Sequence, residues 1–167
     1  MDVSFDFWLG DSLQDIIPVL AEFRSQMGLY GNPKHNLLSD EIVFLRHYLD
    51  SEACVIVAND CGALVGYIGL VTLSEHHPGL GVYDYYGDEL RVTEGPLVHP
   101  SYRSMGIAKS LIQQSLDVCQ QQMASQFIID PSHIINSETQ PIIHHIATHF
   151  LFEKSNSNAI YSKSLIS

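Results

Sequence analysis

The sequence predicts an α/β (α+β) protein with about seven strands and about four helices. Stretches with the two-residue period of strands and stretches with the 3.6-residue period of helices follow one another in the order β-α-α-β-β-β-α-β-α-β-β. Of the 167 residues, 46% are hydrophobic and 16% are charged, a balance typical of a folded globule. No linker or internal repeat divides the chain, so we expect a single domain over residues 1–167.

The N-terminal third predicts one strand and two helices. Val3 to Trp8 alternates apolar and polar residues and predicts the opening strand. Proline is tolerated in the first turn of a helix, so Pro18 predicts a first helix whose N-cap is Asp15. A second helix is expected from a cap near Ser39. The apolar faces of the two helices are predicted to hold Ile16, Ile17, Leu20, Phe23 and Met27, and Ile42, Leu45 and Leu49.

A hairpin and a third strand follow. Ala53–Ala58 and Ala63–Leu73 flank Asn59-Asp-Cys-Gly62, whose composition predicts a hairpin turn. After a long loop over residues 74–88, Leu90 to Val98 is rich in β-branched and apolar residues. Pro100 closes this strand because it lacks a backbone donor.

The C-terminal part predicts two helices and three short strands. The first helix presents apolar and small residues at helical spacing: Ile107, Leu111, Ile112, Ser115, Cys119 and Met123. A strand is expected at Gln126–Asp130, and a helix with Ile142, Ile143, Ile146 and Phe150 on one face comes later. Strands at Leu151–Lys154 and Ala159–Leu165 close the chain around a polar turn.

Small residues occupy the loop between the strand that ends at Val98 and the helix that begins near Ile107. A chain that turns from strand into helix presents unpaired backbone N–H groups, and the helix dipole adds positive charge there. Gly106 and Ala108 have little side chain to keep a bulky anion away from these groups. The sequence therefore predicts a pyrophosphate-sized anion site at residues 103–108. The alternative is an ordinary strand-to-helix turn with a glycine for tight packing.

The segment Leu97-Val-His-Pro-Ser-Tyr-Arg-Ser-Met-Gly-Ile-Ala-Lys-Ser-Leu-Ile112 resembles motif A of the GNAT superfamily of acyl-CoA-dependent N-acetyltransferases. Arg103, Gly106 and Ala108 meet the family pattern Gln/Arg-x-x-Gly-x-Gly/Ala. The resemblance implies the GNAT fold, a central mixed, mostly antiparallel sheet of about seven strands flanked by about four helices. It also implies acetyl-CoA as co-substrate. The implied acetyl-CoA contacts are Leu97, Val98, Arg103, Ser104, Met105, Gly106, Ile107, Ala108 and, as the nearest match to a family asparagine, Asn136.

The resemblance also implies how the motif strand takes part in acetyl transfer. In the family, the thioester carbonyl meets a backbone N–H near the position of Val98, beside a bulge that separates the central strands. Gly95-Pro96 is a candidate for that disruption, and a plain irregular strand end is the alternative. Glu94 stands where many members place the general base, which acts directly or through water. Its alternative reading is a solvated carboxylate on an open strand face.

The acid for the departing thiolate is where this sequence differs from the family. The usual tyrosine precedes a Gly-Phe pair in the last helix. Matching Phe152 to that phenylalanine puts Ala147 at the tyrosine position, whereas matching Phe150 puts His145 there. We expect an N-acetyltransferase that acts on a primary amine of a small molecule or peptide, with Glu94 and His145 as candidate catalytic residues. The alternative is a non-catalytic module that binds acyl-CoA in a regulatory role.

Composition limits the partners. The net charge of −11 and pI near 5.0 argue against nucleic-acid binding, because phosphates would be repelled. The acidic surface favours a cationic acceptor such as an amine; the alternative is that it only keeps the protein soluble. Cys54, Cys61 and Cys119 show no Cys-x-x-Cys spacing and suggest a reducing compartment. The start of the chain lacks the basic region of a signal peptide, and Ala63–Leu73, the longest apolar run, is too short to span a bilayer. We expect a cytoplasmic protein without membrane contact, and the sequence leaves a homodimer open.

Two further groups of polar residues are candidates for other sites. His145 and His149 are four residues apart and His76-His77 are adjacent, but neither has the glutamate or cysteines of a known metal motif, so we expect no metal. The loop over residues 75–89 is a candidate wall for a cationic acceptor, or else an exposed hairpin or dimer contact. The side chains in question there are Tyr83, Asp84, Tyr85, Tyr86 and Asp88.

Overall fold

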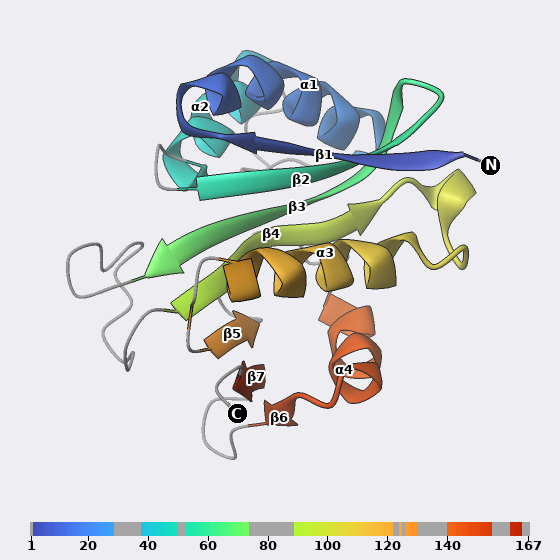
Figure 1. The fold of residues 1–167 in the computed structure, drawn as a ribbon. Coiled ribbons are helices and arrows are strands. Elements are labelled where there is room, and N and C mark those ends of the chain that lie inside the picture. Colours follow the sequence, from blue (N-terminus) through green and yellow to red (C-terminus); the bar gives the residue numbers. More distant parts are fainter. Residues whose placement is uncertain are drawn as a thin grey trace.

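Seven strands form one sheet in the computed structural model, which describes residues 2–28, 38–49, 53–73, 89–121, 124, 126–129, 140–154 and 161–164 (Figure 1). The strands lie in the order β1-β2-β3-β4-β5-β7-β6. Neighbours are antiparallel except for β4 and β5, which are parallel, so the predicted mixed, mostly antiparallel sheet is confirmed. The strands are β1 (Val3–Leu9), β2 (Ala53–Asp60), β3 (Ala63–Leu73), β4 (Glu89–Val98), β5 (Gln126–Ile129), β6 (Glu153–Lys154) and β7 (Tyr161–Ser164).

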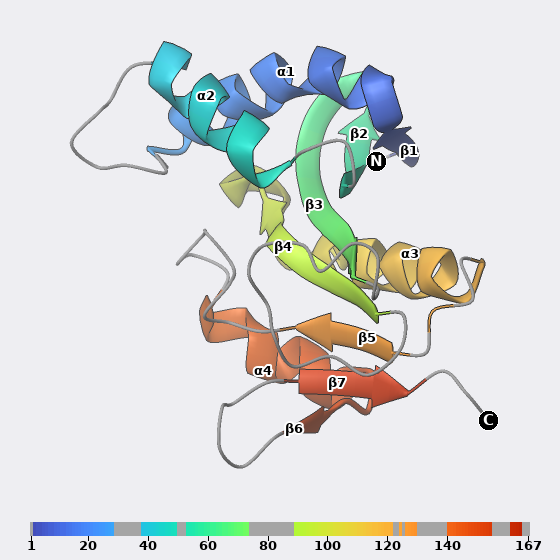
Figure 2. The same cartoon turned by 90° about the vertical axis from the view of Figure 1, so that its left-hand side faces the viewer.

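Four α-helices within the described ranges flank this sheet, as expected. Helices α1 and α2 lie over one face of β1 to β4, and α3 lies over the other face (Figures 1 and 2). The helices are α1 (Leu13–Gln26), α2 (Leu38–Tyr48), α3 (Ile107–Gln121) and α4 (Gln140–His149), with short 3₁₀ turns η1 (Gly10–Ser12) and η2 (Pro100–Tyr102).

The two faces of the sheet build two hydrophobic cores. Successive residues of a strand point to opposite faces, so β2 supplies both cores in alternation. Ala53, Val55 and Val57 pack with α1 and α2, whereas Cys54, Ile56 and Ala58 pack with α3. The predicted helix faces are buried where their side chains are described, except that Met27, Ile42 and Phe150 are partly buried and pack at the edges of their cores. Ile146 and Ala147 of α4 join the core on the α3 side.

The start of α1 differs from the prediction. The helix begins at Leu13 directly after η1, so Asp15 is not its N-cap and Pro18 is its sixth residue. Beginning a turn earlier buries Leu13 completely, and full burial of a leucine stabilises by about 1.5–3 kcal/mol. That gain offsets the hydrogen bond lost at Pro18, which has no backbone N–H. The carbonyl that this N–H would have reached belongs to Gln14, which is exposed to solvent.

The hairpin turn between β2 and β3 is confirmed and is only two residues long. Cys61 and Gly62 both have positive φ, at 51° and 84°. Two successive residues of this kind make the tight turn whose twist matches that of the flanking strands.

Other element ends also differ from the prediction. Helix α2 begins at Leu38, which places Ser39 inside its first turn rather than at its cap. Leu151 is not in a strand: its φ is +61°, and it ends α4. The N–H groups of Leu151 and Phe152 donate to the carbonyls of Thr148 and Ala147, the hydrogen bonds of a Schellman motif. Strand β6 therefore begins only at residue 153, and β7 covers Tyr161–Ser164 of the predicted Ala159–Leu165.

Strands β4 and β5 pair over only part of their length. Glu89–Arg91 lie against Gln126–Ile128 in parallel register. Beyond that point the remaining residues of β4 have no strand partner on this side among the described residues. The C-terminal half of β4 therefore presents one backbone edge to a space between the strands.

Candidate active site

The C-terminal half of β4 is irregular, as the Gly95-Pro96 pair suggests. Tyr67 pairs with Leu97, but Gly69 pairs with Glu94 and Leu70 with Val92, so the register slips by one residue twice. A Cβ at Gly95 would lie 2.8 Å from the Leu97 nitrogen and 2.8 Å from the Tyr67 oxygen, and its φ is +78°. Only glycine fits this conformation and this close approach, so the predicted bulge is confirmed.

The bulge leaves the backbone N–H of Val98 facing away from β3. The N–H of His99 donates to Val65 at 2.8 Å, which makes that pair a hydrogen-bonded one. In an antiparallel ladder such pairs alternate, so the neighbouring pair Val98–Gly66 is not hydrogen-bonded. The Val98 N–H therefore points toward the space between β4 and β5, where the resemblance puts the thioester carbonyl.

The loop after β4 ends at the N-terminus of α3. The Gly106 carbonyl accepts from the Ser110 N–H at 2.9 Å, so Gly106 caps the helix. The N–H groups of Ile107, Ala108 and Lys109 come before Ser110, the first intrahelical donor, so they have no partner within the helix and can bind an anion. Gly106 has φ of +82°, and a Cβ built there meets nothing within 4 Å.

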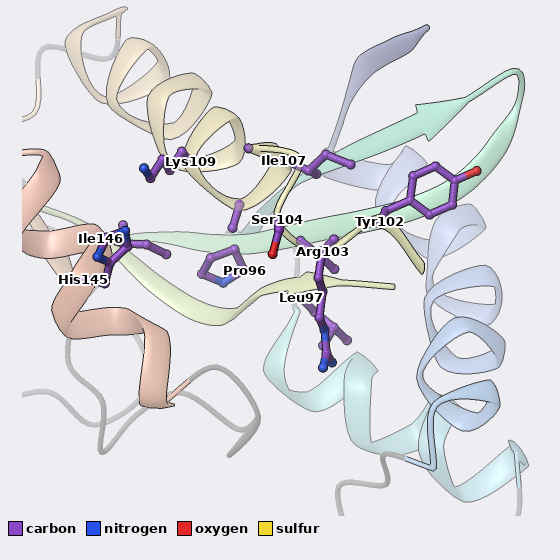
Figure 3. Close-up of a pocket in the computed structure, with 12 residues that line it drawn as sticks. Pro96, Leu97, Tyr102, Arg103, Ser104, Ile107, Lys109, His145 and Ile146 are labelled. Atoms are coloured by element: carbon purple, nitrogen blue, oxygen red, sulfur yellow. The ribbon is translucent and has the colours of Figure 1, made fainter. Parts of the chain in front are cut away.

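A pocket of about 430 Å³ joins these features (Figure 3). His145 and Ile146 of α4 lie on one side of it, the loop of Tyr102, Arg103 and Ser104 on the other (Figure 3). Eight of the predicted site residues line it: Leu97, Val98, Arg103, Ser104, Gly106, Ile107, Ala108 and His145. Glu94 and Met105 do not line it, and Met105 is 54% exposed. Asn136 lies outside the described residues.

Four pocket residues were missed by sequence reasoning: Pro96, Tyr102, Lys109 and Ile146. Lys109 could have been found, because a cation in the first turn of α3 lies next to the predicted anion site. Tyr102 could not have been found, since its side chain is held by a residue of a strand far away in the sequence. Its hydroxyl donates to the Asp60 carboxylate at 2.8 Å and ties the loop to the end of β2.

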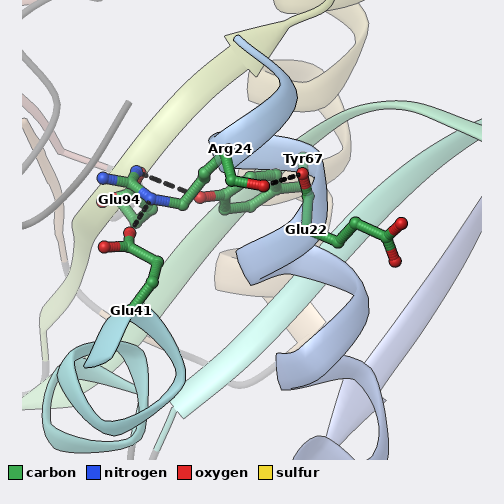
Figure 4. A network of polar contacts seen from close by, with 6 residues as sticks. Glu22, Arg24, Glu41, Tyr67 and Glu94 are labelled. Carbon is green, nitrogen blue, oxygen red and sulfur yellow. Dashed lines mark hydrogen bonds and ion pairs between the residues drawn. The ribbon is translucent and has the colours of Figure 1, made fainter. Parts of the chain in front are cut away.

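Glu94 is completely buried, which excludes the solvated strand carboxylate. Its Oε1 accepts hydrogen bonds from Arg24 Nη1 of α1 and from the Tyr67 hydroxyl of β3, the latter at 2.9 Å (Figure 4). Arg24 Nε also donates to Glu41 of α2 at 2.5 Å. We call Arg24, Glu41, Tyr67 and Glu94 the buried network.

Burial dominates the electrostatics of Glu94. It raises the pKa of this carboxyl from 4.5 to about 7, because the low-dielectric interior disfavours the charged form. Arg24 and the hydrogen bond from Tyr67 oppose the rise in pKa, and the negative charge of Glu41 adds to it. A carboxyl with a pKa near 7 exchanges its proton at neutral pH, as a general base must.

Sequence reasoning missed Arg24 and Glu41, although both gave a signal. Arg24 is seven residues after Ile17 and four after Leu20, which places a cation on the apolar face of α1. Glu41 is four residues before Leu45 on the inner face of α2. A buried charge requires a partner, and two opposite charges on inward helix faces can pair with each other.

The end of helix α4 bears on the two matches to the family tyrosine. Leu151 has the left-handed conformation that glycine favours and is followed by Phe152, which favours the match that puts Ala147 at the tyrosine position. Ala147 is buried in the core and has no side-chain proton to donate. His145 is two residues earlier, exposed, and in the pocket lining.

Other predicted features are only partly covered. No group of three metal-ligating side chains lies together among the described residues. His76, His77 and the loop Tyr83–Asp88 lie outside them. Within the described part of the chain no helix is long and apolar enough to cross a membrane. All three cysteines are free, with Cys54 and Cys119 buried and Cys61 exposed.

Comparison with known proteins agrees with this geometry. The acetyltransferase (GNAT) family model matches residues 20–133. A GNAT-family acetyltransferase from Staphylococcus aureus Mu50 has a similar structure, with a TM-score of 0.63 and 15% identity, covering 99% of this chain and 100% of that one. A protein from Clostridium acetobutylicum, described as a predicted acetyltransferase and crystallised with acetyl-CoA, has a TM-score of 0.64 and 11% identity, covering 93% of each chain.

A ribosomal-protein-alanine N-acetyltransferase from Brucella melitensis biovar Abortus 2308 is also similar, with a TM-score of 0.61 and 19% identity, covering 87% of this chain and 91% of that one. No curated protein matches the sequence significantly. At these low sequence identities the solved structures show a similar fold and nothing more. The family model, by contrast, matches the sequence itself over more than half of its length. The chain belongs to the GNAT family of acetyltransferases, which depend on acetyl-CoA.

Proposed function

We propose that this protein transfers the acetyl group of acetyl-CoA to a primary amine of a small molecule or peptide. One observation carries the proposal: a single pocket is lined by Val98, by the N-terminal turn of α3 and by His145. Within one space, these features supply a backbone N–H that can donate to the thioester oxygen, a site for an anion, and a side chain that can donate a proton. Bound acetyl-CoA would supply the acetyl group as a thioester.

The residues of the anion site fit acetyl-CoA. The N–H groups of Ile107, Ala108 and Lys109 would hold the pyrophosphate, and the side chains of Arg103 and Lys109 add positive charge at the same place. The open space at Gly106 leaves room for phosphate oxygens. The backbone contacts would position acetyl-CoA, because their N–H groups belong to the first turn of α3 and not to mobile side chains.

The chemical step uses three groups of the chain. Glu94 takes the proton of the acceptor ammonium, directly or through water, so that the nitrogen can form its bond to the acetyl carbon. The Val98 N–H donates to the thioester oxygen as negative charge develops there. The carbon–sulfur bond breaks, and His145 gives a proton to the departing sulfur. The products are an acetamide and free CoA, with no oxidation or reduction.

The test is thiol release from acetyl-CoA across a panel of amines, read beside calorimetric binding of acetyl-CoA. We expect saturable binding and turnover with at least one amine. Glu94→Gln should keep acetyl-CoA affinity and lose about 10²-fold in rate near neutral pH. That deficit should shrink as pH rises, because more of the amine then arrives without its proton. Binding without turnover on any amine would instead support a regulatory acyl-CoA-binding module.

A further inference from the structure

The two oxygens of the Glu94 carboxylate have different surroundings. Oε1 accepts from both Arg24 and Tyr67, whereas Oε2 is buried and has no hydrogen-bond partner among the described residues. A buried carboxylate oxygen without a donor is costly and rare. Thr93 Oγ1, on the adjacent residue of β4, is likewise buried without a partner in the described part of the chain.

Both unpartnered atoms belong to residues on the α2 side of the sheet. A Cβ built at Gly69 would lie 3.1 Å from the Glu94 Cβ and 3.3 Å from Thr93 Oγ1, and 2.8 Å from a methyl group of Leu49. Adjacent strand residues normally point to opposite faces, and the register slip at Thr93 is what brings these two together.

Arg24 cannot turn away from Glu94. It is 1% exposed, and its Nε is held by Glu41 while its Nη1 is held against Glu94 (Figure 4). A guanidinium is planar, so fixing two of its nitrogens fixes the whole group. With both glutamates ionised, the four residues of the buried network carry two negative charges and one positive charge.

We propose that Arg24, Tyr67 and Glu41 are positioning residues that hold Glu94 in one orientation and leave Oε2 as the atom that accepts the acceptor's proton. This inference rests on the proposed function and adds the device by which Glu94 performs it. Because Glu94 is buried and does not line the pocket, the proton moves from the ammonium nitrogen to Oε2 through water and leaves the free amine.

The neighbours act on Glu94 with opposite signs, which makes the inference testable. Among the described residues, the charged and titratable groups that act on it from the packed elements are Arg24 of α1, Glu41 of α2 and Tyr67 of β3. The charge of Glu41 raises the pKa of Glu94, and the hydrogen bond from Tyr67 lowers it. Glu41→Gln should therefore lower that pKa and Tyr67→Phe should raise it, although both changes nearly preserve shape.

Two measurements on the full chain read these shifts. The first follows the carboxyl carbons of ¹³C-labelled glutamate through a pH titration, with Glu94 assigned from its loss in Glu94→Gln. The second is the pH profile of kcat/KM for an amine that the parent acetylates. We expect midpoints that move by about one pH unit, down in Glu41→Gln and up in Tyr67→Phe, and together in both measurements.

Two further variants complete the design. Glu22→Gln on α1 is the control, because Glu22 is exposed and its side chain points away from the buried network (Figure 4). It should leave both midpoints where they are in the parent. Arg24→Lys keeps the charge but cannot bond both glutamates, so kcat should fall tenfold or more while acetyl-CoA affinity is kept. The other two substitutions decide the question if Arg24→Lys does not fold.

The outcomes separate this inference from the proposed function. Midpoints that do not move, or that move in the same direction in both variants, overturn it. A shift of the carboxyl titration without the same shift in kcat/KM also overturns it, because Glu94 would then not be the base. A parent that acetylates no amine overturns the proposed function, and with it the role of Oε2, even if the carboxyl titration moves as expected.

Discussion

Glu94 shows how burial changes the acid–base chemistry of a common residue. Its place on the motif strand was predicted from the sequence, but the arginine and tyrosine bound to it come from positions 70 and 27 residues away. No local pattern contains such a partnership. The raised pKa also has a consequence for stability that can be measured separately from activity.

The folded protein should lose stability relative to Glu94→Gln as pH rises. Between the ordinary pKa of 4.5 and the folded-state value of about 7, the folded state binds more protons at Glu94 than the unfolded state does. The free energy of unfolding then falls with rising pH, and the contribution of Glu94 is gone above pH 7. Urea unfolding at about pH 5 and about pH 8 should show a change in the parent–variant difference of roughly 3 kcal/mol. A difference that is the same at both pH values would contradict the shift.

Gly106 allows a test of the anion site in which only charge differs. Asparagine and aspartate both tolerate positive φ, and a side chain at this position projects into open space, so Gly106→Asn and Gly106→Asp should fold alike. Only aspartate places a negative charge beside the α3 N-terminus. Calorimetry should show acetyl-CoA binding weakened at least tenfold more in Gly106→Asp than in Gly106→Asn. Equal affinities would remove residues 103–108 from the pyrophosphate site.

At the scale of elements, the bulge of β4 makes room for the pocket. It depends on Gly95, where a side chain meets backbone on two sides. Gly95→Ala should therefore lower the free energy of unfolding by more than about 3 kcal/mol. The matched control is Gly10→Ala, which has φ of +62° but open space around its Cβ and should cost about 1–2 kcal/mol. Equal losses in denaturant unfolding would mean that close packing at the bulge does not matter.

Helix α4 carries the candidate acid, and its own sequence contains a control. His145 and His149 are both exposed, but only His145 lines the pocket. His145→Ala should lower kcat by about 10²-fold and change acetyl-CoA affinity little, whereas His149→Ala should leave both unchanged. If His145→Ala keeps the parent rate, the thiolate takes its proton from another source.

At the scale of the whole molecule, the end of β4 links two sites on opposite faces of the sheet. Leu97 packs into the core under α1 and α2, and the next residue, Val98, packs into the core under α3. The buried network therefore lies with the first two helices, and the pocket opens toward α3 and α4. In the proposed mechanism, acetyl-CoA and the side chain of Glu94 therefore lie on different sides of the same strand.

The sequence by itself determined the number and order of elements and most of the pocket loop, and it gave a bulge at Gly95-Pro96 as one of two alternatives. Each of these depends on local chemistry: hydrophobic periodicity, residues that allow positive φ, and backbone N–H groups at a helix start. Periodicity also predicted the inward residues of α1 and α3, because a helix face is set by spacing alone. Element ends were less predictable, and Leu151 ended α4 although its sequence suggested a strand.

Only the tertiary structure decided which charges meet. The buried network contains one residue each from α1, α2, β3 and β4, and Tyr102 donates a hydrogen bond to Asp60, 42 positions away in the sequence. The start of α1 was likewise decided by the burial of Leu13, against the preference of Pro18. The physical reason is common to all of these: burial and long-range pairing are properties of packed elements, and a local pattern carries no information about what will be packed against it.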